Sequence, residues 1–305
     1  MARAVISALI TNCSARKTAH PDAGLRFDHL KRGPQEAVAE EWKSALDHAE
    51  AVLPASALYC GRGVSRIQEL GSRIGASLFV VSAGLGLVRG QDLVPSYDLS
   101  VSPGTPSAVQ SRIVGRFSPT DWWQSLRHCR YSVPLRQAFA GNRVGLVLVA
   151  VSSAYVLLLT DEFSALKTEH RARLRLFGAA SAQYPSDLRE QLMPYDKRLD
   201  TLLPGPKVDF AQRAAEHFAT GCSSDDSFPT ELTRQHAWVR GKLSKVAVLP
   251  AKPRQSADDA RIRAIAAKLA AKGISQTRAL AILRGDQGIA CEQTRFRRLF
   301  LEATR

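Results

Sequence analysis

The sequence predicts an α/β protein with a largely parallel central sheet, helices on both faces of that sheet, and a small C-terminal all-α region. Three continuous apolar runs, at residues 4–11, 77–82 and 144–151, predict buried strands. Strands that are apolar along their whole length and alternate with helices are typical of parallel sheets covered on both faces. The chain has 305 residues, enough for one large domain with a small appendage.

The first half of the chain alternates strands and helices. The strand at 4–11 opens into a polar loop at 12–17, and apolar residues at helical spacing predict a helix over 35–51. A strand or turn at 58–63 leads into a further helix. The serine-bounded strand at 77–82 then runs into a glycine-containing loop.

The second half is more helical. The run at 144–151 is the most strand-like of the chain, and Ser152 follows it as the start of a helix. Residues 171–245 predict mostly helices. The segment at 103–134, with its paired tryptophans, permits no assignment.

Prolines near residue 250 predict a domain boundary. We expect an α/β domain at 1–245, a linker at 246–255 and a basic helical region at 256–305. Three short helices with a tight turn before the last match the helix-turn-helix plan, and a generic three-helix cap fits the same pattern. The helices predicted in this region are 258–272, 276–283 and 291–302.

The chain carries 42 Lys and Arg against 28 Asp and Glu, a formal charge of +14. Half of that excess falls between Pro250 and Arg305, where twelve Lys and Arg face five Asp and Glu. Such density favours a polyanion, because cations on phosphates release condensed counterions, so we expect a nucleic-acid partner, foremost double-stranded DNA. A basic helical region without a partner is the alternative. The expected DNA contacts are Arg16, Arg278, Arg295, Arg297 and Arg298, with Gln293 and Thr294 on the same last helix.

The composition excludes several classes of protein. With 45% hydrophobic and 23% charged residues the chain is not a disordered one, and its longest apolar stretch, 144–159, is too short for a membrane span. No cluster of His, Cys, Asp or Glu has metal-ligand spacing, and no dinucleotide or Walker glycine loop occurs, so we expect neither metal nor cofactor. Five cysteines without metal or redox spacing favour a reduced, cytoplasmic setting, and no obligate protein partner is evident.

Four polar loops follow the predicted strands, at the edge where parallel α/β sheets bind ligands. A fifth element, 95–100, follows the third loop closely enough to fold over the same crevice. Each residue also has a purely structural interpretation as a cap, a turn or a half-buried aromatic, but five loops converging on one edge favour a binding site. The candidate residues are Asn12, Cys13, Ser14, Lys17, Tyr59, Ser82, Gly84, Gly86, Tyr97, Asp98, Ser152, Ser153 and Tyr155.

Four motifs occur in order along this part of the chain. They are Asn12-Cys13-Ser14-x-x-Lys17, Leu58-Tyr59, Ser82-Ala83-x-x-Gly86-Leu87 and Pro95-x-Tyr97-Asp98-Leu99-Ser100. Together they resemble uncharacterised bacterial and phage domains related to the peroxide-stress protein YaaA. They are also similar to the lysine-transferring domain of archaeosine synthase, which opens with Cys-Ser-x-x-Lys-Pro. The resemblance covers roughly residues 4–160 and implies a uracil-DNA glycosylase-like fold. The chain departs from the pattern at Asn12, where serine or proline is commoner, and at Thr18, where the motif has proline.

A basic single chain of this size with an added helical tail looks like the Brig-type phage-defence DNA glycosylases. That resemblance implies excision of glucosylated hydroxymethylcytosine from phage DNA, which leaves an abasic site. Cleavage of an N-glycosidic bond passes through an oxocarbenium-like sugar, so it needs a negative charge near C1′ and an aimed water. Asp98, the only carboxylate inside a motif loop, is the candidate for both tasks, with Asp92 in reserve.

The other motif residues would bind the flipped nucleotide. Asn12 would read the base edge through its amide, and Tyr59 or Tyr97 would stack on the base. Ser14 and Ser153, near expected helix starts, would hold the flanking phosphates.

Lys17 has two possible roles. It would pair with a phosphate or, if it is buried with a lowered pKa, form a Schiff base with the abasic sugar. The neighbouring Arg16 suggests an electropositive mouth and favours the phosphate role. The small residues Ala83, Gly84 and Gly86 are compatible with the larger pocket that a sugar-bearing base requires.

Two other functions fit the same residues. One is a base-modifying transferase acting on tRNA, as the archaeosine synthase resemblance implies, for which the basic tail would serve as well. The other is a non-enzymatic DNA-binding sensor, with the α/β domain as ligand sensor and the tail as reader. Mutation of Asp98 distinguishes an enzyme from a sensor.

Overall fold

The computed structural model describes residues 4–141, 144–178, 181–248 and 253–304. The chain divides into two compact units, Met1–Val248 (unit 1) and Leu249–Arg305 (unit 2). The division falls within the stretch 246–255 that the sequence marks as a linker, part of which lies outside the described residues.

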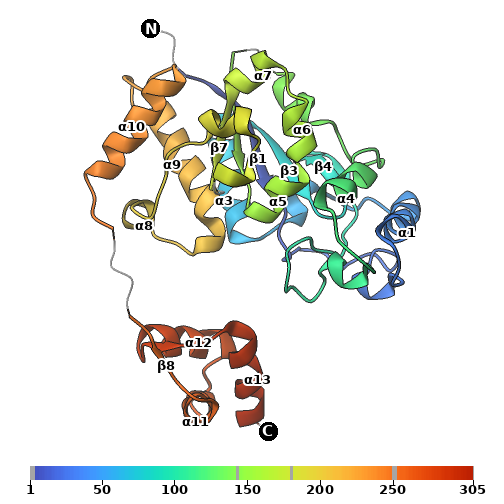
Figure 1. Cartoon of the computed structure of the whole chain (residues 1–305), viewed down its shortest axis with the longest axis vertical. Coiled ribbons are helices and arrows are strands. Elements are labelled where there is room, and N and C mark those ends of the chain that lie inside the picture. Colours follow the sequence, from blue (N-terminus) through green and yellow to red (C-terminus); the bar gives the residue numbers. More distant parts are fainter. Residues whose placement is uncertain (1–3, 142–143, 179–180, 249–252, 305) are drawn as a thin grey trace. The chain divides into compact units, whose positions relative to one another are not determined.

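Unit 1 is built on a five-stranded sheet of order β4-β3-β1-β6-β7 (Figure 1). β3, β1, β6 and β7 pair in parallel, and β4 pairs antiparallel with β3. The predicted α/β class with a largely parallel central sheet is therefore confirmed. The strands are β1 (Ile6–Asn12), β3 (Ser77–Ser82), β4 (Gly86–Arg89), β6 (Leu146–Ala150) and β7 (Leu174–Phe177).

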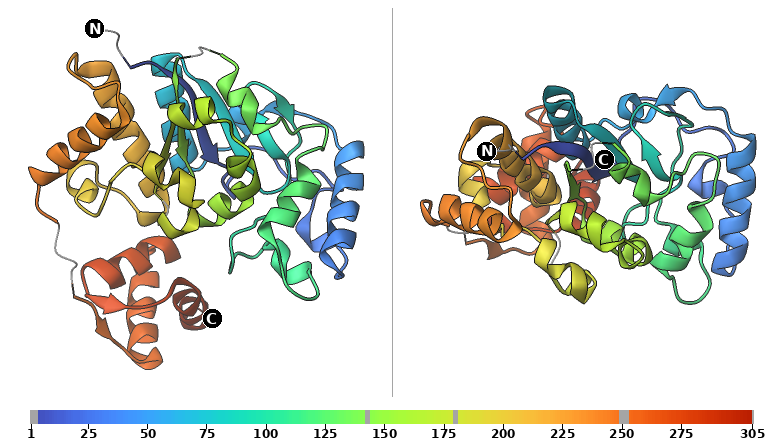
Figure 2. Two further views of the ribbon diagram at one scale, coloured as in Figure 1. Left: turned by 45° about the horizontal axis from the view of Figure 1, so that its top comes forward. Right: turned by 90° about the horizontal axis from the view of Figure 1, so that it is seen from above.

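Helices cover both faces of this sheet, as Figures 1 and 2 show. Alternate residues of β1 enter two separate cores, with Ala8 and Ile10 on one face and Leu9 on the other. The first core is closed by α1 (Gln35–His48), α4 (Pro119–Leu126) and α5 (Ser153–Leu158). The second core is closed by α3 (Arg62–Ile74), α9 (Phe210–Ser224) and α10 (Leu232–Ser244).

Two strands of the five-stranded sheet, β4 and β7, are not predicted from the sequence. β4 is only four residues long and follows β3 through a tight turn, where the sequence indicates only a loop. β7 lies in the stretch that the sequence assigns to helices. Arg175 interrupts its apolar run, so the sequence gives no strand pattern there. That side chain is 2% exposed and donates hydrogen bonds to Gln235 and to the carbonyl of Leu174.

The segment 103–134, which the sequence leaves unassigned, contains a 3-10 turn at Val109–Arg112 and helix α4. Ser118 caps α4 by accepting a hydrogen bond from the Asp121 amide, and Pro119 occupies its first turn. Trp122 and Trp123 are buried and anchor this segment in the first core.

Shorter elements connect the layers. β2 pairs antiparallel with β5, and the expected strand or turn at 58–63 is instead the end of a one-turn helix followed by the start of α3. The short elements are β2 (Leu53–Pro54), β5 (Leu93–Val94), α2 (Ala55–Leu58), α6 (Thr160–Ser164), α7 (Thr168–Arg173) and α8 (Leu199–Leu202).

Unit 2 contains the three predicted helices, α11 (Asp259–Ala270), α12 (Gln276–Gly285) and α13 (Gln293–Ala303). They enclose a separate core in which Ile262, Leu283, Phe296 and Leu299 are fully buried. A two-stranded parallel pair, β8 (Gln255–Ser256) with β9 (Ile289–Ala290), ties the start of the unit to the turn before α13.

Three further observations concern membrane-spanning helices, metal-binding groups and cysteines. Among the described residues, no helix combines the length and apolar character that crossing a bilayer requires. The same part of the chain contains no group of three or more His, Cys, Asp or Glu side chains arranged to hold a metal ion. All five cysteines are free thiols.

Candidate functional site

The candidate site lies at the edge of the sheet where β1, β3 and β6 end. Asn12 is level with Val81 of β3, and Thr11 is level with Ala150 of β6, so the loops after these strands meet. An isolated bridge pairs Lys17 with Tyr59, which brings the second loop to the same edge.

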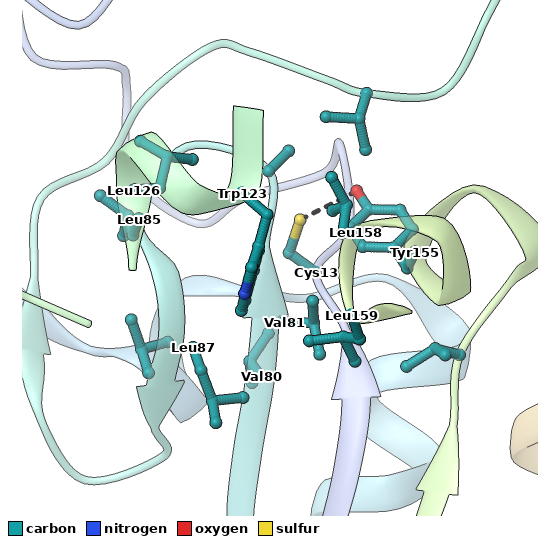
Figure 3. Packing of buried hydrophobic residues seen from close by; sticks show 14 of the residues in the cluster. Cys13, Val80, Val81, Leu85, Leu87, Trp123, Leu126, Tyr155, Leu158 and Leu159 are labelled. Atoms are coloured by element: carbon teal, nitrogen blue, oxygen red, sulfur yellow. Dashed lines mark hydrogen bonds between the residues drawn. The ribbon is translucent and has the colours of Figure 1, made fainter. Parts of the chain in front are cut away.

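Five polar side chains from these loops form a buried polar cluster, made of Cys13, Tyr59, Ser82, Tyr97 and Tyr155. The Ser82 Oγ and the Tyr97 hydroxyl are 2.7 Å apart, and the Tyr59 hydroxyl donates to Ser82 Oγ at 3.1 Å. The Cys13 Sγ lies 3.2 Å from the Tyr155 hydroxyl and accepts from the Tyr97 hydroxyl at 3.4 Å. Figure 3 shows the Cys13 sulfur facing Tyr155 among packed leucine and valine side chains.

The polar cluster is closed to solvent. Tyr59 and Tyr97 are each 1% exposed, and Tyr155 is 5% exposed. Burial raises the pKa of all three phenols well above their usual value, so they remain neutral hydrogen-bonding groups. This corrects the expectation that Tyr59 or Tyr97 presents a ring for stacking on a base: both rings are covered, and Tyr97 packs edge-on against Trp42.

Lys17 extends over the polar cluster from the loop after β1. Its Nζ lies 4.0 Å from the centre of the Tyr97 ring and 5.9 Å from that of Tyr59. Burial lowers the pKa of Lys17, and the nearby Cys13, Asp98 and Cys60 offset part of that shift. Lys17 is thus partly buried and has a lowered pKa, which is the direction that Schiff-base chemistry requires.

Asp98 is exposed and close enough to act electrostatically on both Lys17 and Arg26. Its backbone is held in place, because its amide donates to the Leu25 carbonyl and its carbonyl accepts from the Phe27 amide, both at 2.9 Å. Within the described chain its carboxylate has no hydrogen bond or ion pair and acts electrostatically on Lys17. Asp92, the reserve carboxylate, instead lies 3.6 Å from the Arg89 guanidinium.

The Asn12 amide is fixed by neighbours. Its Oδ1 accepts from the Ser152 amide at 3.0 Å and from Gln212 Nε2 at 3.3 Å, and its Nδ2 donates to the Cys13 carbonyl at 3.0 Å. The expected reading of a base edge by a paired donor and acceptor is therefore not available to Asn12, since its oxygen is already used twice.

Gln212 belongs to this edge although the sequence gives no sign of it. Its Nε2 lies 3.2 Å from Thr11 Oγ1 and 3.0 Å from the Ala150 carbonyl, which links α9 to the ends of β1 and β6. Gln212 is 2% exposed and sits within an amphipathic helix that the sequence does predict. Only the packing of α9 against the sheet selects it from the other polar residues of that helix.

The residues expected to hold phosphates divide into two kinds. Ser14 is used internally, because its Oγ accepts from the Gly61 amide at 3.1 Å and donates to the Arg16 carbonyl at 2.6 Å. Arg16 and Ser153 are exposed. Arg16 and Ser153 thus remain open to an external group, whereas the Ser14 hydroxyl closes a turn.

The two glycines expected at the ligand pack against protein instead. Gly84 is buried, and a Cβ there would lie 2.9 Å from the Trp42 ring, whose Nε1 donates to the Gly84 carbonyl. Gly86 has a φ of 76°, and a Cβ there would lie 3.2 Å from the Leu126 carbonyl. Both glycines therefore allow a tight turn between β3 and β4 rather than a ligand cradle.

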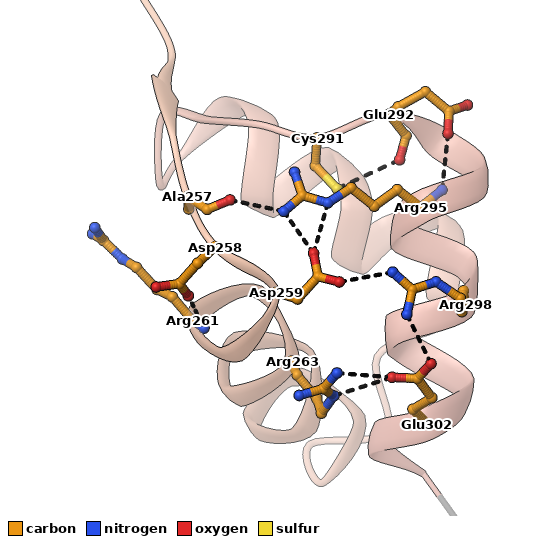
Figure 4. A network of polar contacts seen from close by, with 10 residues as sticks. All are labelled: Ala257, Asp258, Asp259, Arg261, Arg263, Cys291, Glu292, Arg295, Arg298 and Glu302. Atoms are coloured by element: carbon orange, nitrogen blue, oxygen red, sulfur yellow. Dashed lines mark hydrogen bonds and ion pairs between the residues drawn. The ribbon is translucent and has the colours of Figure 1, made fainter.

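In unit 2, two of the expected DNA contacts are engaged within the protein. Arg295 and Arg298 both pair with Asp259, at 2.6 and 2.7 Å (Figure 4). Arg297 and Arg278 are exposed. Of the expected DNA contacts in this unit, Arg295 and Arg298 therefore already share an internal ion-pair partner, whereas Arg278 and Arg297 do not.

Comparison of the chain with family models, curated proteins and solved structures gives no match.

Proposed function

We propose that unit 1 excises a modified base from DNA by attack of the Lys17 amine on C1′ of the deoxyribose, with Asp98 accepting the proton. The placement of Lys17 carries this proposal. Its Nζ lies over the Tyr97 ring, mostly withdrawn from water, at the edge where three parallel strands end. Ligands of parallel α/β sheets bind at this edge.

The surroundings of Lys17 suit a nucleophile better than a phosphate anchor. A lysine attacks carbon only as the neutral amine, and a pKa lowered by burial increases the neutral fraction near pH 7. A phosphate anchor would work best with a fully charged, exposed side chain, and Arg16 offers that in the same loop. We therefore assign Lys17 to the sugar and Arg16 to the backbone of the DNA.

The proposed reaction balances without a cofactor. The amine lone pair forms the Nζ–C1′ bond while the N-glycosidic bond breaks. The electron pair of the N-glycosidic bond leaves with the base, and the base takes a proton from solvent. The new ammonium transfers a proton to Asp98, the sugar ring opens to an imine with protonation of O4′, and water hydrolyses the imine. The net change is the addition of one water across the N-glycosidic bond.

Asp98 fits the role of proton acceptor because its carboxylate is exposed and has no internal partner among the described residues. A negative charge at this place also stabilises the oxocarbenium character that the sugar develops as the base leaves. The two backbone hydrogen bonds to Leu25 and Phe27 fix the position of Asp98 without using its side chain.

Trapping with borohydride tests the proposal directly. Purified protein would be incubated with DNA that carries glucosylated hydroxymethylcytosine and, separately, with unmodified DNA. Borohydride reduces the imine to a stable amine, so we expect a protein–DNA adduct and abasic sites on the modified DNA alone. Lys17→Arg keeps the positive charge but cannot form an imine, and we expect it to abolish the adduct. Asp98→Asn should slow base release by about a hundredfold or more, since general-base catalysis typically contributes at least about that factor.

Each other outcome points elsewhere. Abasic sites without an adduct, unchanged in Lys17→Arg, would return Lys17 to the phosphate role and leave hydrolysis by water and Asp98. No abasic sites on either DNA would contradict base excision from DNA, and a deazaguanine-bearing tRNA would be the next substrate. If Asp98→Asn left phage defence in the cell unchanged, the non-enzymatic DNA-binding sensor would be favoured.

A further inference from the structure

The acidic residues of unit 2 are almost all committed to holding that unit together. Residues 249–305 contain twelve Lys and Arg but only five Asp and Glu. The Asp258 carboxylate accepts from the Arg261 amide and caps α11, and the Glu292 carboxylate accepts from the Thr294 and Arg295 amides and caps α13. Asp259 and Glu302 form ion pairs with three arginines, so most of the excess positive charge of the unit lies outside these pairs.

Asp259 and Glu302 belong to an arginine network between α11 and α13, made of Asp259, Arg263, Arg295, Arg298 and Glu302 (Figure 4). Arg263 pairs with Glu302 at 3.0 Å, and Arg298 bridges Asp259 and Glu302. Arg295 also donates to the Ala257 carbonyl at 2.9 Å. On this side of α13 the arginines are paired with carboxylates and oriented toward α11, and three arginines against two carboxylates leave the network a net charge of +1.

A different side of α13 forms a groove with α12. Its volume is about 380 Å³, and Leu280, Ala281 and Phe296 supply its apolar lining. The polar residues that line it are Gln276, Thr277, Arg284, Gln293 and Arg297. Arg284 is oriented by two hydrogen bonds to the Cys291 carbonyl, while Arg297 makes no hydrogen bond or ion pair with any described residue.

We propose that the α12–α13 groove, with Arg297 as its free cation, is the surface that binds double-stranded DNA. The groove combines an uncompensated charge with amide and hydroxyl groups, which is the chemistry that contacts phosphates and base edges. The arginine network, in contrast, serves the packing of α11 on α13. The proposal shares only the DNA partner with the proposed function, and binding is measured separately from base excision.

The side chains of unit 2 favour a duplex over single strands or RNA. Single strands are bound by stacking bases on exposed aromatic rings, but the only aromatic residues of unit 2, Phe296 and Phe300, are buried. Double-helical RNA has a major groove too deep and narrow for a helix to read. A short helix with Gln293 and Arg297 one turn apart on its exposed face suits the wide major groove of DNA.

The test uses the full chain and a short unmodified duplex, with binding titrated over a range of salt. Arg297→Gln should weaken binding about tenfold and reduce the slope of log affinity against log salt by about one. Lys268→Gln is the matched control, because it removes the same charge from an exposed site on α11, which contributes nothing to the groove. We expect at most a twofold effect of Lys268→Gln, since a distant charge acts only through the screened field.

Two further variants separate contact from charge and from folding. The double substitution Gln293→Ala with Thr277→Ala leaves the charge unchanged, so it should weaken binding several-fold without altering the salt slope. Arg298→Gln should lower thermal stability yet bind more tightly than Arg297→Gln, because its charge is already paired. Arg297→Lys should restore the salt slope.

The proposal is overturned if Lys268→Gln weakens binding as much as Arg297→Gln, because binding would then depend only on diffuse charge. Tighter binding of single-stranded DNA or of an RNA duplex would overturn the choice of partner. Absence of abasic sites together with intact duplex binding would contradict only the proposed base excision. Abasic-site formation together with duplex binding that does not depend on Arg297 would contradict only the proposed role of the groove.

Discussion

The polar cluster of unit 1 and the arginine network of unit 2 each join segments that are distant in sequence, but by opposite means. The polar cluster uses hydroxyl and thiol groups, and its tyrosines are at most 5% exposed. The arginine network uses full charges whose side chains are 35% to 54% exposed. The first is closed to water and the second is surrounded by it.

This contrast predicts how each region responds to change. In a closed site, a removed partner leaves the others without hydrogen bonds, and water cannot replace it. In an exposed network, water and salt ions take the place of a lost partner, so each pair contributes little. The polar cluster should therefore respond strongly to substitution and weakly to salt, and the arginine network should do the reverse.

The largest effect is expected from Ser82→Ala in unit 1. Ser82 Oγ accepts from the Leu85 amide at 3.0 Å and serves the hydroxyls of Tyr59 and Tyr97. Its loss removes one hydrogen-bond partner from each of four buried polar groups, the fourth being the Gly84 amide, so we expect the free energy of unfolding to fall by about 3 kcal/mol. Urea unfolding followed by tryptophan fluorescence measures this, because all four tryptophans lie in unit 1.

Ser44→Ala provides the control, since Ser44 is exposed on α1. It should change the free energy of unfolding by no more than about 0.5 kcal/mol. Equal effects of the two substitutions would contradict the view that Ser82 organises a closed polar cluster.

The next effect is a change in the pH dependence of unit 1. Burial lowers the pKa of Lys17 in the folded state, whereas in the unfolded state it keeps its usual value near 10.5. Between these two pKa values the unfolded state binds more protons, so this residue makes stability rise with pH. We expect Lys17→Met to remove that rise. Above about pH 10 stability should fall in both proteins, because the unfolded phenols ionise while the buried ones of the polar cluster do not.

Thermal unfolding from about pH 7 to about pH 10 compares the two proteins under the same buffers. Parallel pH profiles of wild type and Lys17→Met would contradict the lowered pKa, and with it the nucleophilic role proposed for this lysine.

The sequence predicts the helices and strands of both regions better than it predicts which side chains form hydrogen bonds or ion pairs with one another. Continuous apolar runs give β1, β3 and β6 nearly at their observed bounds, because a strand buried on both faces has no other pattern. The convergence of Cys13, Tyr97 and Tyr155 follows from where their loops start. That these side chains bond one another rather than a ligand depends on burial, which no local pattern encodes.

The same limit explains the errors. Gln212 reaches the ends of β1 and β6 only because of the way α9 packs. Other polar residues of α9 have the same local sequence context, so the sequence does not single out Gln212. Arg295, Arg297 and Arg298 look alike in the sequence, but Asp259 lies 36 residues before Arg295 and forms ion pairs with two of the three. Charge counting therefore gives the net charge of unit 2 and not the face on which it is free.

A smaller effect is expected from Asp259→Asn in unit 2. The substitution removes the ion pairs to Arg295 and Arg298, which join α11 to α13. Because these groups are exposed, we expect the amides of α11 and α13 to exchange only about fivefold faster, and the difference to shrink in high salt. Segment-resolved hydrogen exchange measures this without a fluorescent probe in unit 2. A salt-independent, much larger acceleration would show that the network is desolvated like the polar cluster.

The smallest effect is expected from Glu302→Gln, at the outer end of the arginine network. Glu302 pairs with Arg263 and Arg298 at 3.0 Å each, and it keeps 37% of its side-chain surface exposed. Gln retains one acceptor for these guanidinium groups, so we expect exchange in α13 to accelerate by no more than about twofold at low salt. At about 1 M salt, where the Debye length is about 3 Å, the difference should vanish. Arg263→Gln alone and in combination completes a double-mutant cycle, and a coupling that persists in high salt would mean that this edge of unit 2 is held by geometry rather than by screened charge.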